Sequence, residues 1–367
     1  MKNRRTYFSI LQVFILAFTS QIALYPLLTS AAPASPYPDS TKIGSLTFDF
    51  SSEFFHANGS DQWPLTWADD GAIYGVWGDG NGWSGTTKFF MGVTKITGNP
   101  PTLSGTDMWK GNDKNRKPMG FVADTNQTMY LFYSTPDDGW NGTYGGKSSD
   151  NGLTWDFSLP KVFDLAADGV YVVGIAQFGP GYSNVPPGVD AAYFYVYLSG
   201  RKSGKDTSGK NVYLGRVPKA QLFIRSAYSY FNGLDGTGNP IWSANWAMKQ
   251  PVFQDPAGMA YHVNVSYNPG INKFIYAKGQ NTSELGIFEG STLWGPWKSI
   301  YYGQFKDNLW KFTYQFTQKW TSADGLTMWM IWSGWPEYDR VNFTKATLML
   351  NTTIPPGPPQ NLQILVQ

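Results

Sequence analysis

Most of the chain alternates between apolar and polar residues in short runs, each broken by Gly, Pro, Asn or Asp. Residues 63–68 and 72–77 are two such runs, joined by the tight turn Asp69-Asp70-Gly71. Alternation with a period of two, bounded by turn residues, is typical of β-strands, and two runs joined by so short a turn predict a hairpin. We therefore expect an all-β fold.

The same hairpin recurs along the chain, with first strands that begin near residues 63, 118, 172, 262 and 314. One interval is much longer than the others, which predicts an insertion at about residues 203–249 in the third unit. Residues 220–230 follow a proline and lack helix breakers, so we expect one helix there. Five antiparallel meander units predict a single five-bladed β-propeller.

The composition agrees with strands and turns. The chain has 16 Trp, 22 Tyr and 24 Phe, together 17% of the residues, beside 40 Gly and 24 Pro. The absence of Cys excludes a disulfide scaffold and a cysteine nucleophile, and two histidines are too few for a multi-histidine zinc site. A net charge of +2 provides no basic surplus for phosphates, so we expect no nucleic-acid partner. We also expect a monomer.

The two ends of the chain differ from the repeated body. Lys2, Arg4 and Arg5 precede an apolar run at residues 9–28 and small residues at 29–32, which predicts a signal peptide over residues 1–31 and a secreted protein. An uncleaved anchor is the alternative. Cleavage removes three basic residues, so the net charge goes from +2 to −1 and we expect no membrane association afterwards. We assign residues 32–43 to a disordered leader, 44–353 to the propeller and 354–367 to a Pro-rich tail.

Several phrases of this sequence resemble those of a known family. They are residues 61–71 (DQWPLTWADDG), 78–80 (GDG), 215–219 (GRVPK), 266–270 (SYNPG), 295–297 (GPW) and 320–325 (WTSADG). In this order they are similar to the secreted propeller family catalogued as domain of unknown function 4185. The resemblance implies a five-bladed propeller related to endo-acting D-arabinanases, and similar propellers house arabinanases, xylosidases and fructan-active enzymes. It implies a polysaccharide or oligosaccharide ligand.

Residues 148–155 (SSDNGLTW) match the Asp-box turn, Ser-x-Asp-x-Gly-x-Thr-Trp. The aspartate of such a turn caps backbone amides, and the glycine allows a positive φ. We therefore interpret Asp150 as a structural residue of a blade's outer edge.

Alternating strands return every second loop to the same face, so propeller topology sorts the polar residues. Asp69, Asp70 and Asp324 lie in the turns after the first strands and are expected on the face opposite the site. The loops of the other face also carry Asp137, Asp190, Glu337 and Asp339. The candidate site residues on that face are Asp61, Trp63, Asp79, Trp83, Arg116, Lys117, Asp138, Trp140, Gln177, Tyr182, His262, Lys319 and Trp335.

Carboxylates and aromatic rings around one opening resemble a carbohydrate site. Glycoside hydrolysis needs two carboxyl groups, one acid and one base or nucleophile. We predict Asp61 and Asp79 as this pair, with the other candidates as substrate contacts and Arg116 as a group that lowers a neighbouring pKa or binds an anionic substrate. Aspartate in Gly78-Asp79-Gly80 is also a common turn residue or calcium ligand. We expect no required cofactor, and a structural calcium ion is compatible with the many oxygen ligands.

The leading interpretation is a secreted glycoside hydrolase that acts on a furanoside-rich, arabinan-like polysaccharide. A non-catalytic carbohydrate-binding propeller is one alternative. A polysaccharide lyase is another, with His262 or Tyr182 as the base and Arg116 or Lys117 neutralising a uronate. Two carboxylates within glycosidase range of each other, about 5–10 Å, at the opening would favour hydrolysis, whereas a site dominated by Arg, Lys, His and Tyr would favour the lyase.

Overall fold

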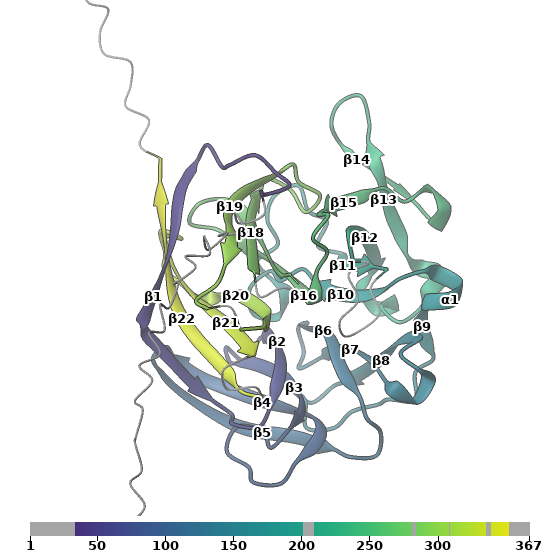
Figure 1. Cartoon of the computed structure of the whole chain (residues 1–367). Helices are drawn as coiled ribbons and strands as arrows, with labels where there is room; N and C mark the ends of the chain where they lie inside the picture. The colour runs from purple at the N-terminus through teal and green to yellow at the C-terminus, as the bar shows by residue number, and fades with distance from the viewer. Residues whose placement is uncertain (1–33, 201–208, 281–283, 308, 335–338, 352–367) are drawn as a thin grey trace, which may run out of the picture. The chain divides into compact units, whose positions relative to one another are not determined.

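The computed structural model describes residues 34–200, 209–280, 284–307, 309–334 and 339–351 (Figure 1). The predicted signal peptide at 1–31, the predicted tail at 354–367 and Trp335 lie outside the described residues. Within the described segments, no helix is long and apolar enough to cross a membrane.

The described strands form five antiparallel sheets around a common centre, which confirms the predicted five-bladed β-propeller (Figure 1). Blade one comprises β2 (Asp61–Trp67), β3 (Ile73–Gly80), β4 (Phe89–Asn99) and β5 (Thr102–Gly111). Blade two comprises β6 (Lys117–Ala123), β7 (Met129–Ser134), β8 (Gly142–Ser148) and β9 (Lys161–Asp164). Blade four comprises β16 (Ala260–Asn268), β17 (Lys273–Gly279), β18 (Glu284–Gly290) and β19 (Trp297–Gln304).

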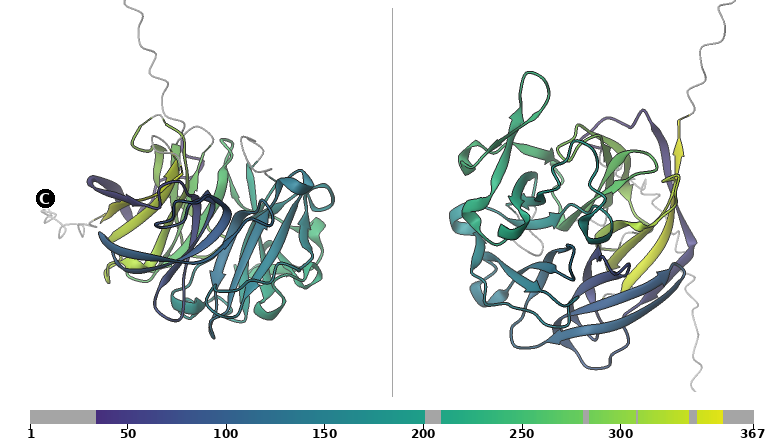
Figure 2. Two further views of the ribbon diagram at one scale, coloured as in Figure 1. Left: turned by 90° about the horizontal axis from the view of Figure 1, so that it is seen from below. Right: turned by 180° about the vertical axis from the view of Figure 1, so that it is seen from behind.

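Blade five joins the two ends of the described chain. Its strands are β20 (Lys311–Thr321), β21 (Thr327–Gly334), β22 (Val341–Leu350) and, on the outside, β1 (Ile43–His56). β1 pairs antiparallel with β22 from Ile43↔Leu350 to His56↔Val341, and the two strands lie side by side in Figures 1 and 2. β1 is not among the strands predicted from the sequence. Its pairing with β22 closes the ring because the first and last strands of the described chain share one sheet.

Blade three carries the insertion. Its strands are β10 (Tyr171–Ile175), β11 (Tyr193–Ser199), β12 (Asn211–Pro218), β13 (Ser229–Leu234), β14 (Pro240–Ser243) and β15 (Pro251–Gln254). Both β13 and β15 pair with β12, and the hairpin β13–β14 projects from the blade in Figure 1. The inserted part therefore lies between β12 and β15, within the range predicted from the spacing.

The predicted helix at 220–230 is wrong. This stretch contains only the 3₁₀ turns η3 (Lys219–Gln221) and η4 (Arg225–Ala227) before β13 begins. Tyr228 and Tyr230 are buried in the blade-three core, and packing of these rings overrides local helix propensity. The other short helices are η1 (Pro136–Asp138), α1 (Leu165–Asp168), η2 (Pro180–Tyr182) and η5 (Trp246–Met248).

Aromatic packing between blades forms much of the core. The rings of Phe253 in β15 and Tyr276 in β17 stack with centroids 4.3 Å apart, joining blades three and four. Tyr37, which lies in the segment 32–43 predicted to be a disordered leader, packs against Phe253 at 5.0 Å and against Phe288 at 5.6 Å. The described end of that segment therefore lies against these two blades.

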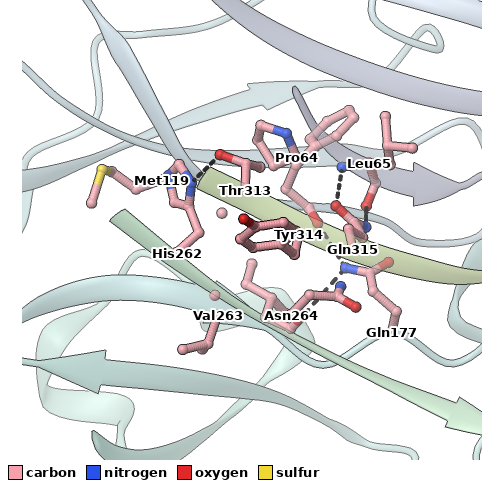
Figure 3. A pocket seen from close by; sticks show the side chains of 14 residues that line it. Pro64, Leu65, Met119, Gln177, His262, Val263, Asn264, Thr313, Tyr314 and Gln315 are labelled. Carbon is pink, nitrogen blue, oxygen red and sulfur yellow. Dashed lines mark hydrogen bonds between the residues drawn. The ribbon is translucent and has the colours of Figure 1, made fainter. Parts of the chain in front are cut away.

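Polar side chains link the inner strands across the centre. The Gln315 side chain of β20 accepts a hydrogen bond from Leu65 N at 2.9 Å and donates one to Leu65 O at 2.8 Å. Thr66 accepts from Ala123 N at 2.9 Å and donates to Gln177 Oε1 at 3.0 Å. A cavity of about 20 Å³ remains among these side chains (Figure 3). Since that volume suits about one water molecule, this part of the channel is a packed core.

Replacing Gln315 by leucine is expected to destabilise the propeller by about 2–4 kcal/mol, because the buried N–H and C=O of Leu65 each lose a partner. Urea denaturation of the Gln315→Leu variant measures this loss. The matched control is Gln304→Leu, whose side chain is exposed at the end of β19 and whose change should stay within about 0.5 kcal/mol. Equal stabilities of the two variants would contradict a linking role for Gln315.

Candidate functional site

The inner strands β2, β6, β10, β16 and β20 begin at the same end of the channel, which we call the upper mouth. In blade one, Asp61 pairs with Gly78 at this end, whereas Trp67 pairs with Ile73 at the other end. Asp70 and Asp324 lie beyond the far ends of β2 and β20, in the turns to β3 and β21. This is the separation that the meander topology predicts.

The upper mouth has an unusual backbone. The ladder between each inner strand and its neighbour shifts register near the start of the inner strand, as between Gln62 and Leu65 in blade one. Left-handed φ values, rare for residues other than glycine, occur at Gln62 (73°), Trp63 (60°), Asp79 (47°) and Asp339 (59°). Bulges and left-handed residues re-aim side chains and gather at functional sites.

Asp61 is a buried carboxyl group at this mouth, with 5% of the residue exposed. Burial raises its pKa well above the ordinary value, and the nearby carboxylates of Asp339 and Asp79 raise that pKa further. The positive charges of Lys117 and Lys88 act in the opposite direction. Gly78 allows a close approach here, since a Cβ at that position would lie 3.2 Å from Asp61 Oδ1. Asp61 therefore favours the protonated form.

Asp79 has a different environment from Asp61. Its carboxylate forms an ion pair with Lys117 Nζ, and 36% of its side chain is exposed, against 10% for Lys117. Burial raises the pKa of the third carboxyl, Asp339, with Asp79 adding to the rise. The backbone O of Asp339 accepts hydrogen bonds from Gly59 N and Ser60 N, which ties this residue of blade five to the chain just before Asp61.

Asp61, Asp79 and Lys117 thus belong to one electrostatic cluster, as the sequence predicts for the two aspartates. Asp339 completes the set; its place on this face was expected from the sequence, but it was not among the candidate site residues. We call Asp61, Asp79, Lys117 and Asp339 the carboxylate cluster. It unites blades one, two and five, and it places a buried carboxyl with a raised pKa beside an ion-paired carboxylate.

Arg116 does not join this cluster, contrary to expectation. Only 3% of the residue is exposed, and its guanidinium binds both carboxylate oxygens of Asp113 at 2.6 and 2.8 Å. The guanidinium carbon also lies 4.1 Å from the centroid of the Phe157 ring and 5.4 Å from that of Tyr133. Because the guanidinium of Arg116 is already paired with Asp113, it is not available to bind an anionic substrate.

Trp63 is not a sugar platform, because its side chain is fully buried and its indole N–H donates to Ser60 O at 2.9 Å. The left-handed turn at residues 62 and 63 directs this ring into the core. Trp83 stacks on His56 with centroids 4.3 Å apart and meets Trp63 edge-on at 6.4 Å. Trp83 is partly exposed, but it packs between β1 and blade one.

His262 and Gln177 connect inner strands. His262 Nε2 lies 2.9 Å from Pro118 O and Nδ1 lies 3.2 Å from Thr313 Oγ1 (Figure 3). Gln177 donates to Phe121 O at 2.9 Å in addition to accepting from Thr66. Both side chains line the small cavity of the channel, so their roles in substrate binding are not supported.

Tyr182 and Lys319 lie at the wrong end of the channel for the predicted site. Tyr182 follows β10, is 2% exposed, and its pKa is raised well above normal by burial. Lys319 Nζ donates to Gly71 O at 2.6 Å, in the turn between β2 and β3. The 11-residue strand β20 begins at Lys311, earlier than the sequence pattern indicates, so Lys319 falls near its far end.

Asp138 lies in η1, where it accepts from Tyr144 Oη at 2.9 Å and from Asn141 N at 3.0 Å. It lines an open hollow of about 440 Å³ on blade two. Trp140 is partly exposed in the same loop, but it is not among the residues that line this hollow. The sequence therefore predicts a loop with binding potential, but not the hollow beside it.

Asp150 caps its own turn, as expected for a structural residue. Its carboxylate accepts hydrogen bonds from Leu153 N at 3.1 Å and Thr154 N at 2.9 Å. Among the described residues, no group of three or more His, Asp or Glu side chains is placed to hold a metal ion. A structural calcium ion thus stays a prediction without a site in this part of the chain.

Solved glycosidase structures share a distant likeness with this chain. RS223-Beta-xylosidase is 10% identical, with 82% of this chain and 95% of that chain covered and a TM-score of 0.49. The GH43_1 enzyme from Xanthomonas citri, complexed with xylotriose, is 10% identical, with 81% of this chain and 91% of that chain covered and a TM-score of 0.46. The alpha-L-arabinofuranosidase PaAbf62A from Podospora anserina, in complex with cellotriose, is 11% identical, with 85% of this chain and 97% of that chain covered and a TM-score of 0.43.

No family model matches the chain, and no curated protein matches it. Structural similarity at these identities and TM-scores does not establish the activity of this chain. The chemistry available at the upper mouth follows from the residues of the carboxylate cluster.

Proposed function

We propose that the protein is a secreted glycoside hydrolase whose reaction takes place at the carboxylate cluster. One observation carries this proposal: the buried carboxyl of Asp61, whose pKa is raised by burial, lies at the same mouth of the channel as the Asp79 carboxylate, which pairs with Lys117. Unequal protonation of two carboxyl groups in one site is what glycosidic hydrolysis requires. The furanoside-rich, arabinan-like substrate follows only from the resemblance of residues 61–71 and the other quoted phrases to the propeller family of unknown function.

The two carboxyl groups have complementary roles in this mechanism. Asp61 donates its proton to the leaving glycosidic oxygen, which breaks the bond between that oxygen and the anomeric carbon. Asp79 either attacks the anomeric carbon or removes a proton from the attacking water, and its ion pair with Lys117 fixes its orientation. Asp339 acts through Asp61 as a positioning residue, since its charge raises the pKa of the acid.

A substrate screen tests the proposal directly. The purified propeller is incubated with arabinan, arabinogalactan, fructan, xylan and uronate polymers, and both new reducing ends and unsaturated products are measured. We expect reducing ends from a neutral, furanoside-rich polymer. Unsaturated products from a uronate polymer would instead establish a lyase, and binding without any cleavage would establish a carbohydrate-binding propeller.

The structure favours hydrolysis over the lyase alternative. A lyase acting at the upper mouth needs its base there, but Tyr182 lies at the far end of the channel. Both ring nitrogens of His262 already contact neighbouring oxygens, at 3.2 Å from Thr313 Oγ1 and 2.9 Å from Pro118 O. Arg116 is bound by Asp113, so the cation best suited to a uronate is already paired.

Charge substitutions around Asp61 are expected to move the alkaline limb of the pH profile of kcat/KM in opposite directions. Activity falls as pH rises through the pKa of Asp61, because the acid must be protonated. Lys117 lowers that pKa, so Lys117→Met should move the limb to higher pH. Asp339 raises it, so Asp339→Asn should move the limb to lower pH.

The control for this pair is Lys345→Met, which removes an exposed lysine paired with Asp49 on blade five. Its profile should match that of the unchanged protein. Shifts of Lys117→Met and Asp339→Asn in the same direction would show that Asp61 is not the acid.

A further inference from the structure

The open hollow on blade two is a second feature with the properties of a binding site. It has a volume of about 440 Å³, within the range of small-molecule sites. Its lining includes Tyr133, Thr135, Asp137, Asp138, Tyr144 and Phe157, which we call the blade-two hollow. None of these residues belongs to the carboxylate cluster.

Aromatic rings form a rigid part of this hollow. Tyr133 and Tyr144 stack with centroids 5.5 Å apart and planes at 21°, and Phe157 meets Tyr133 edge-on at 5.6 Å. The guanidinium of Arg116, itself held by Asp113, lies over Phe157 and Tyr133. The rings are therefore fixed before a ligand arrives, which lowers the entropic cost of binding.

Polar groups lie beside these rings. Asp138 accepts a hydrogen bond from Tyr144 Oη and is 3.3 Å from Lys161 Nζ, which also pairs with Asp164 at 2.9 Å. Asp137 and Lys114, which also lines the hollow, are exposed, and no ion pair involves either of them among the residues that the structure describes. One free carboxylate and one free ammonium give the opening hydrogen-bonding capacity without a strong net charge.

We propose that the blade-two hollow is an accessory binding site for a neutral sugar unit. Rings of tyrosine and phenylalanine offer apolar surfaces to the C–H faces of a sugar, while the carboxylate and ammonium groups bind its hydroxyl groups. The carboxylates of Asp137, Asp138 and Asp164 outnumber the ammonium groups of Lys114 and Lys161 around the hollow, and this excess of negative charge disfavours a uronate polymer. The ligand class rests on the proposed function, since a neutral polysaccharide bound at the carboxylate cluster is the natural source of such a unit.

The site also has a defined relation to the carboxylate cluster. Arg116 and Lys117 are adjacent in sequence at the start of β6, and Arg116 contacts the rings of the hollow whereas Lys117 pairs with Asp79. A single polymer could therefore engage both places across the start of blade two. An accessory site there would increase affinity for long chains through a raised effective concentration.

Binding to an inactive protein tests this proposal independently of hydrolysis. Asp61→Asn protein is titrated by calorimetry with arabinohexaose, xylohexaose, a fructan hexamer and an oligogalacturonate hexamer. We expect at least one neutral hexamer to bind, and Tyr144→Ala on this background should weaken its Kd at least tenfold. Asp137→Ala, at an exposed position that packing does not constrain, should weaken it about threefold.

The matched control is Tyr267→Ala on the same background. Tyr267 is likewise partly buried with a bonded hydroxyl, but it lies next to the β16–β17 turn on blade four. It should leave the Kd within twofold. The proposal would be overturned by unchanged affinity in both Tyr144→Ala and Asp137→Ala, by binding of the uronate hexamer alone, or by binding of none of the probes. Failure of Asp61 as the acid would appear separately, as retained hydrolysis in Asp61→Asn.

Discussion

Asp61→Asn is expected to lower kcat on the true substrate by about 10³-fold, because a positioned general acid contributes about 10²–10⁴-fold to such reactions. The substitution keeps the shape of the side chain and removes the proton. Asp79→Asn should have a comparable effect, since it removes the carboxylate partner. Single-turnover and steady-state kinetics with reducing-end detection measure both losses.

The fold should survive these changes. The pKa of Asp61 is raised in the folded protein, so its contribution to stability is present at low pH and is lost as pH rises through that folded pKa. Asparagine does not titrate, and Asp61→Asn should therefore lack this loss in urea denaturation at high pH. The control is Asp324→Asn, in an exposed turn at the other end of the channel, which should keep activity within twofold. Full activity in Asp61→Asn would remove Asp61 from the mechanism.

The number of blades could be predicted from the sequence because each inner hairpin repeats the same alternation and turn. β1 was not predicted, although Leu46, Phe48 and Phe50 alternate with polar residues in it. A single strand far from its partner has no hairpin turn to identify it. Its partner β22 lies almost 300 residues further along the chain, and only the closed ring brings the two together.

The site could be predicted only as far as topology determines it. Strand direction places Asp61 and Asp79 at one mouth, and the structure brings them together. Side-chain direction depends on local backbone, and the left-handed φ of Trp63 turns a predicted platform into a core residue. Arg116 is likewise next to Lys117 in sequence, but it binds Asp113 and packs on aromatic rings. The local sequence does not indicate which of its possible partners Arg116 contacts.

The largest effect on stability is expected at a buried ion pair of blades three and four. Lys278 Nζ lies 2.5 Å from Asp255 Oδ2, and the two side chains are 0% and 2% exposed. Tyr302 Oη and Ala257 N also donate to Asp255, at 3.0 and 2.8 Å. Lys278→Met leaves a buried carboxylate without its counter-charge, so the free energy of unfolding should fall by about 3–5 kcal/mol.

Two comparisons separate this charge effect from a loss of packing. Lys345→Met breaks the pair with Asp49, in which both side chains are 38% exposed, and should leave the stability nearly unchanged because solvent screens that pair. Adding Asp255→Asn to Lys278→Met removes the unpaired charge while an amide oxygen still accepts from Tyr302 and Ala257. The double variant should therefore recover part of the stability in urea denaturation. A double variant no more stable than Lys278→Met alone would show that the unpaired charge of Asp255 is not the cause of the loss.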